Sequence, residues 1–128
     1  MAEPRILIID DSENIRKSLR LTLEFRGWNV DEAADGAEGL KRIEERRFDL
    51  VFVDLVMPGL SGVEWIRKIR GDLHMEHLPI IILSAEQRES KKEALAAGAN
   101  AGVDKPFSPA QIFTVVEQHL ARGSDEAP

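Results

Sequence analysis

The chain has 128 residues, of which 43% are hydrophobic and 31% are charged, and its formal net charge is −6. This size and composition fit one globular domain with its own core, and a chain without cysteine has no disulfides and no thiolate metal sites. An acidic chain without a basic stripe is not expected to bind nucleic acid directly, and its N-terminal apolar run is too short for a signal peptide or a membrane span, so we expect a cytoplasmic protein.

Strands and helices alternate five times along the sequence. The predicted strands are short apolar or weakly alternating runs at Arg5–Asp10, Trp28–Ala33, Asp49–Asp54, Pro79–Ser84 and Asn100–Asp104. A helix is predicted after each strand, and the fourth covers Glu86–Ala97. In the other four helices the inward-facing apolar residues are Ile15, Leu19 and Leu23, then Ala37, Leu40 and Ile43, then Val63, Ile66 and Ile69, and last Ile112, Val115, Val116 and Leu120.

Alternation at this spacing predicts an α/β fold in which five parallel strands are joined by right-handed helical crossovers. Strands this apolar are covered on both faces, so we expect a doubly wound (βα)5 sheet with helices on each side. Ser12 and Pro109 mark helix starts, and Gly27 and Gly98 mark helix ends. Residues 1–121 are predicted to form one domain, and residues 122–128 form a polar tail or the start of a linker.

Polar side chains that can carry out chemistry stand where the predicted strands end. Asp10 and Asp11 end the first strand, Asp54 ends the third and Ser84 the fourth, and Lys105 follows the fifth. Ligands of an open parallel sheet bind beyond the carboxyl ends of the strands, so the topology brings these residues to one edge. A single aspartate at a strand end is more often a cap or a turn residue, but the group in this chain order is far more specific.

Three carboxylates in one shallow cleft repel one another, so either some of their pKa values rise or a cation lies between them. Oxygen ligands without histidine or cysteine suit Mg²⁺. A lysine offers positive charge to a phosphate oxygen, a serine offers a hydrogen bond, and an aspartate can act as a nucleophile toward phosphorus. The residues by themselves therefore indicate a Mg²⁺-assisted site at which an aspartate accepts a phosphoryl group.

Five motifs carry a resemblance to a known family: IIDDS, DLVMPGLSG, ILSA, EALAAGA and DKPF. With them the chain resembles the receiver domain of two-component response regulators, the family of the chemotaxis protein CheY, from about Arg5 to Leu120. The resemblance implies a flavodoxin-like sheet with the strand order 2-1-3-4-5 known for CheY. It also implies a signalling domain that catalyses only its own phosphorylation and dephosphorylation, and is therefore not an enzyme.

The resemblance implies a role for each residue that matches the family motifs. Asp54 would be the phosphoacceptor, charged by a sensor histidine kinase or a histidine phosphotransfer protein. Ser84 would bind one phosphoryl oxygen and Lys105 another, and the bond from Lys105 to Pro106 is usually cis in this family. An output partner, which the sequence does not identify, would bind the surface of the fourth helix, fifth strand and fifth helix.

The same resemblance implies a set of Mg²⁺ ligands. Asp11 would hold the ion more directly, and Asp10 largely through water. Asp54 would bind it as well, together with the backbone carbonyl of Val56. The apolar side chain of Val56 cannot orient an attacking water, and Glu86 could pair with Lys105 when the site is empty. We therefore expect a modest rate of autodephosphorylation.

One position departs from the family pattern. An aromatic residue is common three residues before the lysine, where it reports phosphorylation by swinging inward, but this chain has Gly102 there and no tyrosine at all. We expect the usual coupling between Ser84 and an aromatic to be missing. Signalling would then use the loop after Ser84 and the helix over Glu86–Ala97. The alternative is a phosphate relay or sink without an output of its own.

Two other functions compete with this interpretation. A phosphohydrolase of the haloacid dehalogenase kind also forms an aspartyl phosphate, but it needs a second aspartate two residues later, where this chain has Val56. A small-molecule binder such as a flavodoxin needs a phosphate-cradling loop after the first strand, and the acidic DDSEN segment would repel phosphate.

No role in a site is expected for the three histidines or the two tryptophans. His74 and His77 lack a metal-binding spacing. His119 is expected to be solvated near the end of the last helix, where the helix dipole favours it. Trp28 and Trp65 are predicted to be packing residues.

Overall fold

The computed structural model describes residues 3–85 and 88–125, and it describes side chains for residues 3–85 and 89–120. Within these ranges strands and helices alternate as predicted. The strands are β1 Arg5–Ile9, β2 Asn29–Ala33, β3 Leu50–Asp54, β4 Ile80–Ser84 and β5 Ala101–Asp104. The helices are α1 Glu13–Phe25, α2 Gly36–Glu45, α3 Gly62–Arg67, α4 Arg88–Ala97 and α5 Pro109–Asp125, with a π-helical segment η1 at Lys68–Asp72.

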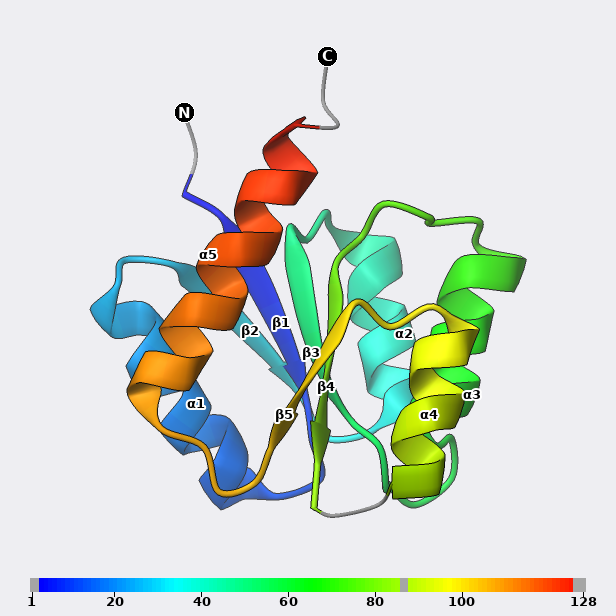
Figure 1. Ribbon diagram of the computed structural model, residues 1–128. Coiled ribbons are helices and arrows are strands. Elements are labelled where there is room, and N and C mark those ends of the chain that lie inside the picture. The colour runs from blue at the N-terminus through cyan, green and yellow to red at the C-terminus, as the bar shows by residue number, and fades with distance from the viewer. Residues whose placement is uncertain (1–2, 86–87, 126–128) are drawn as a thin grey trace.

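The five strands form one parallel sheet in the order β2-β1-β3-β4-β5. Helices α1 and α5 cover one face of the sheet, and α2, α3 and α4 cover the other (Figure 1). The predicted doubly wound fold and its strand order are therefore confirmed. No helix in the described ranges is both long enough and apolar enough to cross a membrane.

A separate hydrophobic core lies on each face of the sheet. Alternate strand residues point to opposite faces, so Val53 and Ile82 pack with Trp65 beneath α3, while Phe52 packs with Ile112 of α5 on the other side. All of these side chains are fully buried. Packing in the two cores fixes the position of each strand along its own axis. It therefore also fixes where each strand ends at the carboxyl edge.

Trp28 is a packing residue, as predicted. Its ring meets Phe113 of α5 edge-on, with ring centroids 6.4 Å apart. The guanidinium of Arg26 lies over both rings, 5.5 Å from the Trp28 centroid and 4.7 Å from that of Phe113, and it forms an ion pair with Glu117. These contacts join the start of β2 to α5.

The predicted inner face of α2 is wrong at one residue. Ala37 is exposed, and the buried residues of the helix are Gly36, Gly39 and Ile43. A Cβ atom on Gly39 would lie 2.5 Å from Cδ1 of Ile9. The helix therefore approaches the sheet through its glycines, and this approach turns Ala37 outward. A pattern that counts only apolar side chains does not detect such a contact.

His119 is buried, at 5% exposed, and so the prediction that it is solvated is wrong. It lies seven residues after Ile112 on the same face of α5, four residues after Val115 and three after Val116, which is the spacing of an inward-facing stripe. Its Nδ1 lies 2.7 Å from the carbonyl oxygen of Val115, so the ring meets a polar partner within its own helix. This partner allows the imidazole to replace an apolar residue in the core.

Arg70 joins three segments at the amino edge of the sheet, where the strands begin. Helix α3 ends at Arg67, and Arg70 lies in η1, which continues from it. Its guanidinium donates to the carbonyl oxygen of Met75 at 2.6 Å, to that of Gly98 at 2.8 Å and to Oδ1 of Asn100 at 2.9 Å. The carboxyl end of α4 is thereby fixed to η1 and to the start of β5.

Candidate functional site

Three aspartates meet at the carboxyl edge of the sheet. Asp10 follows β1, Asp11 comes next, and Asp54 ends β3. Each offers one carboxylate oxygen, and these oxygens lie within 4.8 Å of one another. Asp10 and Asp54 are buried, whereas Asp11 is exposed. The cluster is therefore open to solvent on the side of Asp11.

Lys105 lies against two of these carboxylates. Its Nζ is 3.0 Å from Oδ2 of Asp10 and 3.4 Å from Oδ1 of Asp54. Its backbone N–H donates to the carbonyl oxygen of Ser84 at 2.7 Å, and the Lys105–Pro106 peptide bond is cis, as the resemblance implies. Burial alone would lower the pKa of the lysine, but the carboxylates of Asp10 and Asp54 outweigh it and raise that pKa. The ammonium is therefore charged at neutral pH.

The pKa of Asp54 is raised above its ordinary value. Burial is the main cause, and the negative charge of Asp10 adds to it. The ammonium of Lys105 and the backbone amide of Val56 oppose the shift without cancelling it. The folded protein therefore favours a protonated Asp54 more than the unfolded chain does, and the ionised carboxylate costs stability.

Replacing Asp54 by Asn is expected to stabilise the fold at neutral pH in the absence of divalent cations. An acid whose pKa is raised on folding contributes stability below its unfolded pKa, and this contribution is lost as the pH rises through its folded pKa. An asparagine never ionises, so the advantage of the variant shrinks as the pH falls toward the ordinary pKa of aspartate. Urea unfolding at several pH values measures the difference, with exposed Asp72→Asn as the control. A variant less stable than wild type at neutral pH would contradict the assigned direction.

The burial and hydrogen bonding of the Asp10 carboxylate indicate whether the cluster suits a metal ion. Its side chain is fully buried, and its Oδ1 accepts a hydrogen bond from the backbone N–H of Ser12 at 2.9 Å. Within the described residues its Oδ2 makes no directed hydrogen bond, and its ionic contact there is with Lys105. A buried carboxylate oxygen without a directed donor, beside two further carboxylates, fits a hard cation such as Mg²⁺.

The loop after β3 holds Asp54 at the edge. Gly59 adopts a φ of 77°, which reverses the chain, and the N–H of Gly62 then donates to the carbonyl oxygen of Leu55 at 3.0 Å. A reciprocal capping box between Ser61 and Glu64 starts α3. The loop thus returns directly onto the end of β3.

The hydroxyl of Ser84 makes a contact that sequence reasoning missed. Ser84 is fully buried at the end of β4, and its hydroxyl donates to Oδ1 of Asp104 at 3.1 Å. The ammonium of Lys91 in α4 lies 3.0 Å from the same oxygen. Asp104 precedes Lys105 in the DKPF motif, which could have drawn attention to it, but the chain pattern gives no sign of Lys91. Glu86, the expected partner of Lys105, lies outside the described residues.

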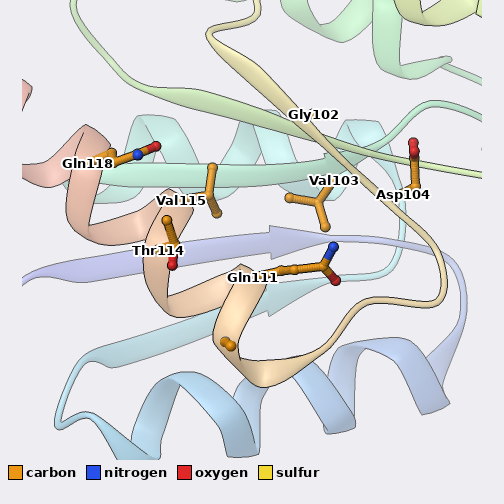
Figure 2. A pocket seen from close by; sticks show the side chains of 8 residues that line it. Gly102, Val103, Asp104, Gln111, Thr114, Val115 and Gln118 are labelled. Carbon is orange, nitrogen blue, oxygen red and sulfur yellow. The ribbon is translucent and has the colours of Figure 1, made fainter.

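Gly102 lies on β5 beside a hollow of about 440 Å³ between β5 and α5. Figure 2 shows Val103 pointing toward α5 and Asp104 pointing away from it. Gln111 and Val115 of α5 line the other side of the hollow. Successive β5 residues thus face different helices, and Gly102 shares the face of Asp104.

The fold and this edge together define a flavodoxin-like α/β protein with an acidic site paired to a lysine at the carboxyl ends of its strands. The model of the response regulator receiver domain family matches residues 6–117 of the chain. The protein therefore belongs to the receiver domains of two-component response regulators.

Named relatives agree with this family. The chain is 39% identical over 124 residues to the phosphate regulon transcriptional regulatory protein PhoB of Rhizobium meliloti (strain 1021), a match that covers 96% of the chain and 55% of PhoB. It is 37% identical over 123 residues to the transcriptional regulatory protein ResD of Bacillus subtilis (strain 168), covering 95% of the chain and 50% of ResD. The chain thus spans about half the length of these curated relatives.

A solved structure shares both the fold and the length of the chain. The CheY-like response regulator receiver domain protein from Methanospirillum hungatei JF-1 superposes with a TM-score of 0.92 at 31% sequence identity. The match covers 98% of this chain and 100% of that one. The predicted membership in the CheY-like receiver family is confirmed.

Proposed function

We propose that the chain is a phosphorylation-switched receiver domain whose Asp54 accepts a phosphoryl group from the phosphohistidine of a histidine kinase or a phosphotransfer protein. The observation that carries this proposal is the cluster of Asp10, Asp11 and Asp54, with the ammonium of Lys105 lying 3.0 Å and 3.4 Å from two of its carboxylates. Family membership supports it. The proposal retains the cytoplasmic location expected from the sequence.

The proposed chemistry uses side chains at the carboxyl edge of the sheet. A carboxylate oxygen of Asp54 attacks phosphorus, the bond from phosphorus to the donor imidazole breaks, and the imidazole nitrogen keeps the electron pair. Lys105 supplies positive charge to a phosphoryl oxygen, and Ser84 donates a hydrogen bond to another. Asp10, Asp11, Asp54 and the carbonyl of Val56 would hold Mg²⁺, which when bound neutralises charge on the transferring group.

Acetyl phosphate with Mg²⁺ tests the proposal without a partner kinase. We expect intact mass spectrometry to show wild type gaining the mass of one phosphoryl group, and Asp54→Asn gaining none. Asp72→Asn is the matched control, because this exposed aspartate pairs only with Lys68 in the described part of the chain. Labelling of Asp54→Asn would overturn the proposal. Steady turnover of phosphomonoesters would instead support a phosphohydrolase.

Two observations bear on how the domain passes on its signal. Gly102 replaces the reporting aromatic, which favours a phosphate relay or sink as the second candidate function. PhoB and ResD are about twice as long as the chain, which favours residues 1–121 as the receiver of a larger regulator, with residues 122–128 starting a linker. We propose that a partner then binds the surface of α4, β5 and α5, and that the domain acts on no other substrate.

A further inference from the structure

A polar chain runs from the proposed phosphorylation site to α4. Ser84 and Asp104 are register partners on β4 and β5, so their side chains leave the sheet on the same face. The hydroxyl of Ser84 donates to Oδ1 of Asp104 at 3.1 Å, and the Nζ of Lys91 lies 3.0 Å from that same oxygen. Asp104 therefore links a buried hydroxyl at the site to the first half of α4.

Gly102 makes room for this link. A Cβ atom placed on Gly102 would lie 3.1 Å from Cε of Lys91 and 3.0 Å from Cγ1 of Ile82. The alkyl chain of Lys91 therefore crosses β5 over the glycine to reach Asp104. Any larger residue at Gly102 would compete with Lys91 for this space, so the glycine and the lysine belong to one arrangement.

The Ser84 hydroxyl has one proton, and it can serve only one strong acceptor at a time. In the structure that acceptor is Asp104, whose carboxylate is charged and whose pKa is lowered by the hydrogen bonds from Lys91 and Ser84. A phosphoryl group on Asp54 would be the competing acceptor. Donation to the phosphoryl group therefore requires Ser84 to release Asp104.

We propose that Asp104 and Lys91 are positioning residues that hold the Ser84 hydroxyl in a resting orientation and connect it to α4, in place of the aromatic that Gly102 removes. The inference rests on the proposed function and deepens it. Phosphorylation of Asp54 breaks the bond between Ser84 and Asp104, and the freed carboxylate changes the position of Lys91 and of the start of α4. Signalling without an aromatic then has a defined route.

A thermodynamic cycle tests the link, with Mg²⁺ and beryllofluoride as the phosphoryl mimic. Isothermal titration measures mimic binding to wild type, Asp104→Ala, Ser84→Ala and the double variant. Loss of Asp104 frees the hydroxyl, so we expect Asp104→Ala to tighten binding about fivefold when Ser84 is present. When Ser84 is already alanine, the same substitution should leave the affinity unchanged.

The cycle also separates the link from simple electrostatics. If Asp104 acted only through its negative charge, its removal would tighten binding of the anionic mimic equally with and without Ser84. That result would overturn the inference while the proposed function stands. Failure of wild type to bind the mimic at all would overturn both. These two failures are distinguishable in a single set of titrations.

Amide NMR spectra of α4 supply a readout that a structural role of Lys91 would not move. Adding the mimic should shift the amides of residues 89–97 in wild type and in Lys91→Arg, which keeps the positive charge. The shifts should shrink in Lys91→Met but not in Lys92→Met, because Lys92 is exposed and makes no ion pair within the described residues. Full shifts in Lys91→Met would overturn the assignment of Lys91.

Discussion

Replacing Lys105 by Met is expected to slow phosphorylation of Asp54 about 100-fold, the usual cost of removing one preorganised donor from a site of charge transfer. The same substitution should tighten Mg²⁺ binding severalfold. The ammonium lies 3.0 Å from a carboxylate oxygen of Asp10 and 3.4 Å from one of Asp54, so it neutralises part of the charge that attracts a divalent cation. A methionine keeps the length of the side chain and removes its charge.

The opposite signs of these two effects make the prediction specific. A variant that merely unfolds would lose both phosphorylation and Mg²⁺ affinity. Initial rates with acetyl phosphate measure the first effect, and the rise in melting temperature on adding Mg²⁺ measures the second. Lys92→Met is the matched control, and it should match wild type in both. Weaker Mg²⁺ binding in Lys105→Met would show that the lysine does not compete for the same carboxylates.

Replacing Gly62 by Ala is expected to destabilise the fold by about 3 kcal/mol, at the upper end of overpacking costs. A Cβ atom at this buried position would lie 2.5 Å from the carbonyl oxygen of Asp54 and 2.8 Å from Cα of Leu55. Both are backbone atoms, which cannot rotate away as a side chain does. The added methyl must therefore displace the end of β3, and we expect slower phosphorylation of Asp54 as well.

Gly71 is the matched control for this substitution. It is exposed in η1, and a Cβ atom there would meet nothing within 4 Å. Gly71→Ala should change the free energy of unfolding by less than about 1 kcal/mol, in the stabilising direction that helix propensity favours. Urea unfolding followed by circular dichroism compares the two variants. Equal stabilities would mean that the loop after β3 absorbs the methyl group, contrary to the packing described above.

The sequence predicts the fold and the site well where the signal is local to a strand or its end. Apolar or weakly alternating runs predict each strand to within a residue or two of its observed bounds. The polar residue that ends or follows a run marks the edge where ligands bind. Asp10, Asp54 and Lys105 come together for this reason, because a parallel sheet aligns its carboxyl ends.

Features that depend on the approach of two elements could not be predicted in this way. The burial of Gly39 depends on how close α2 comes to Ile9, and no local pattern encodes that distance. His119 looks polar in sequence but finds its partner in the carbonyl oxygen of Val115. The contact of Lys91 with Asp104 joins two elements across an open position at Gly102, which sequence reasoning treated only as a missing aromatic.

The contacts of Arg70 decide how α4 can move if phosphorylation displaces it. The guanidinium fixes the carboxyl end of the helix through Gly98 and Asn100, whereas Lys91 lies in the half nearest the site. A helix of 10 residues is about 15 Å long. It would therefore act as a lever with a fixed fulcrum, and a tilt of about 10° would carry its first residue about 2.6 Å while its last residue stayed in place. We therefore expect a partner that detects this motion to bind the N-terminal half of α4, where the displacement is largest.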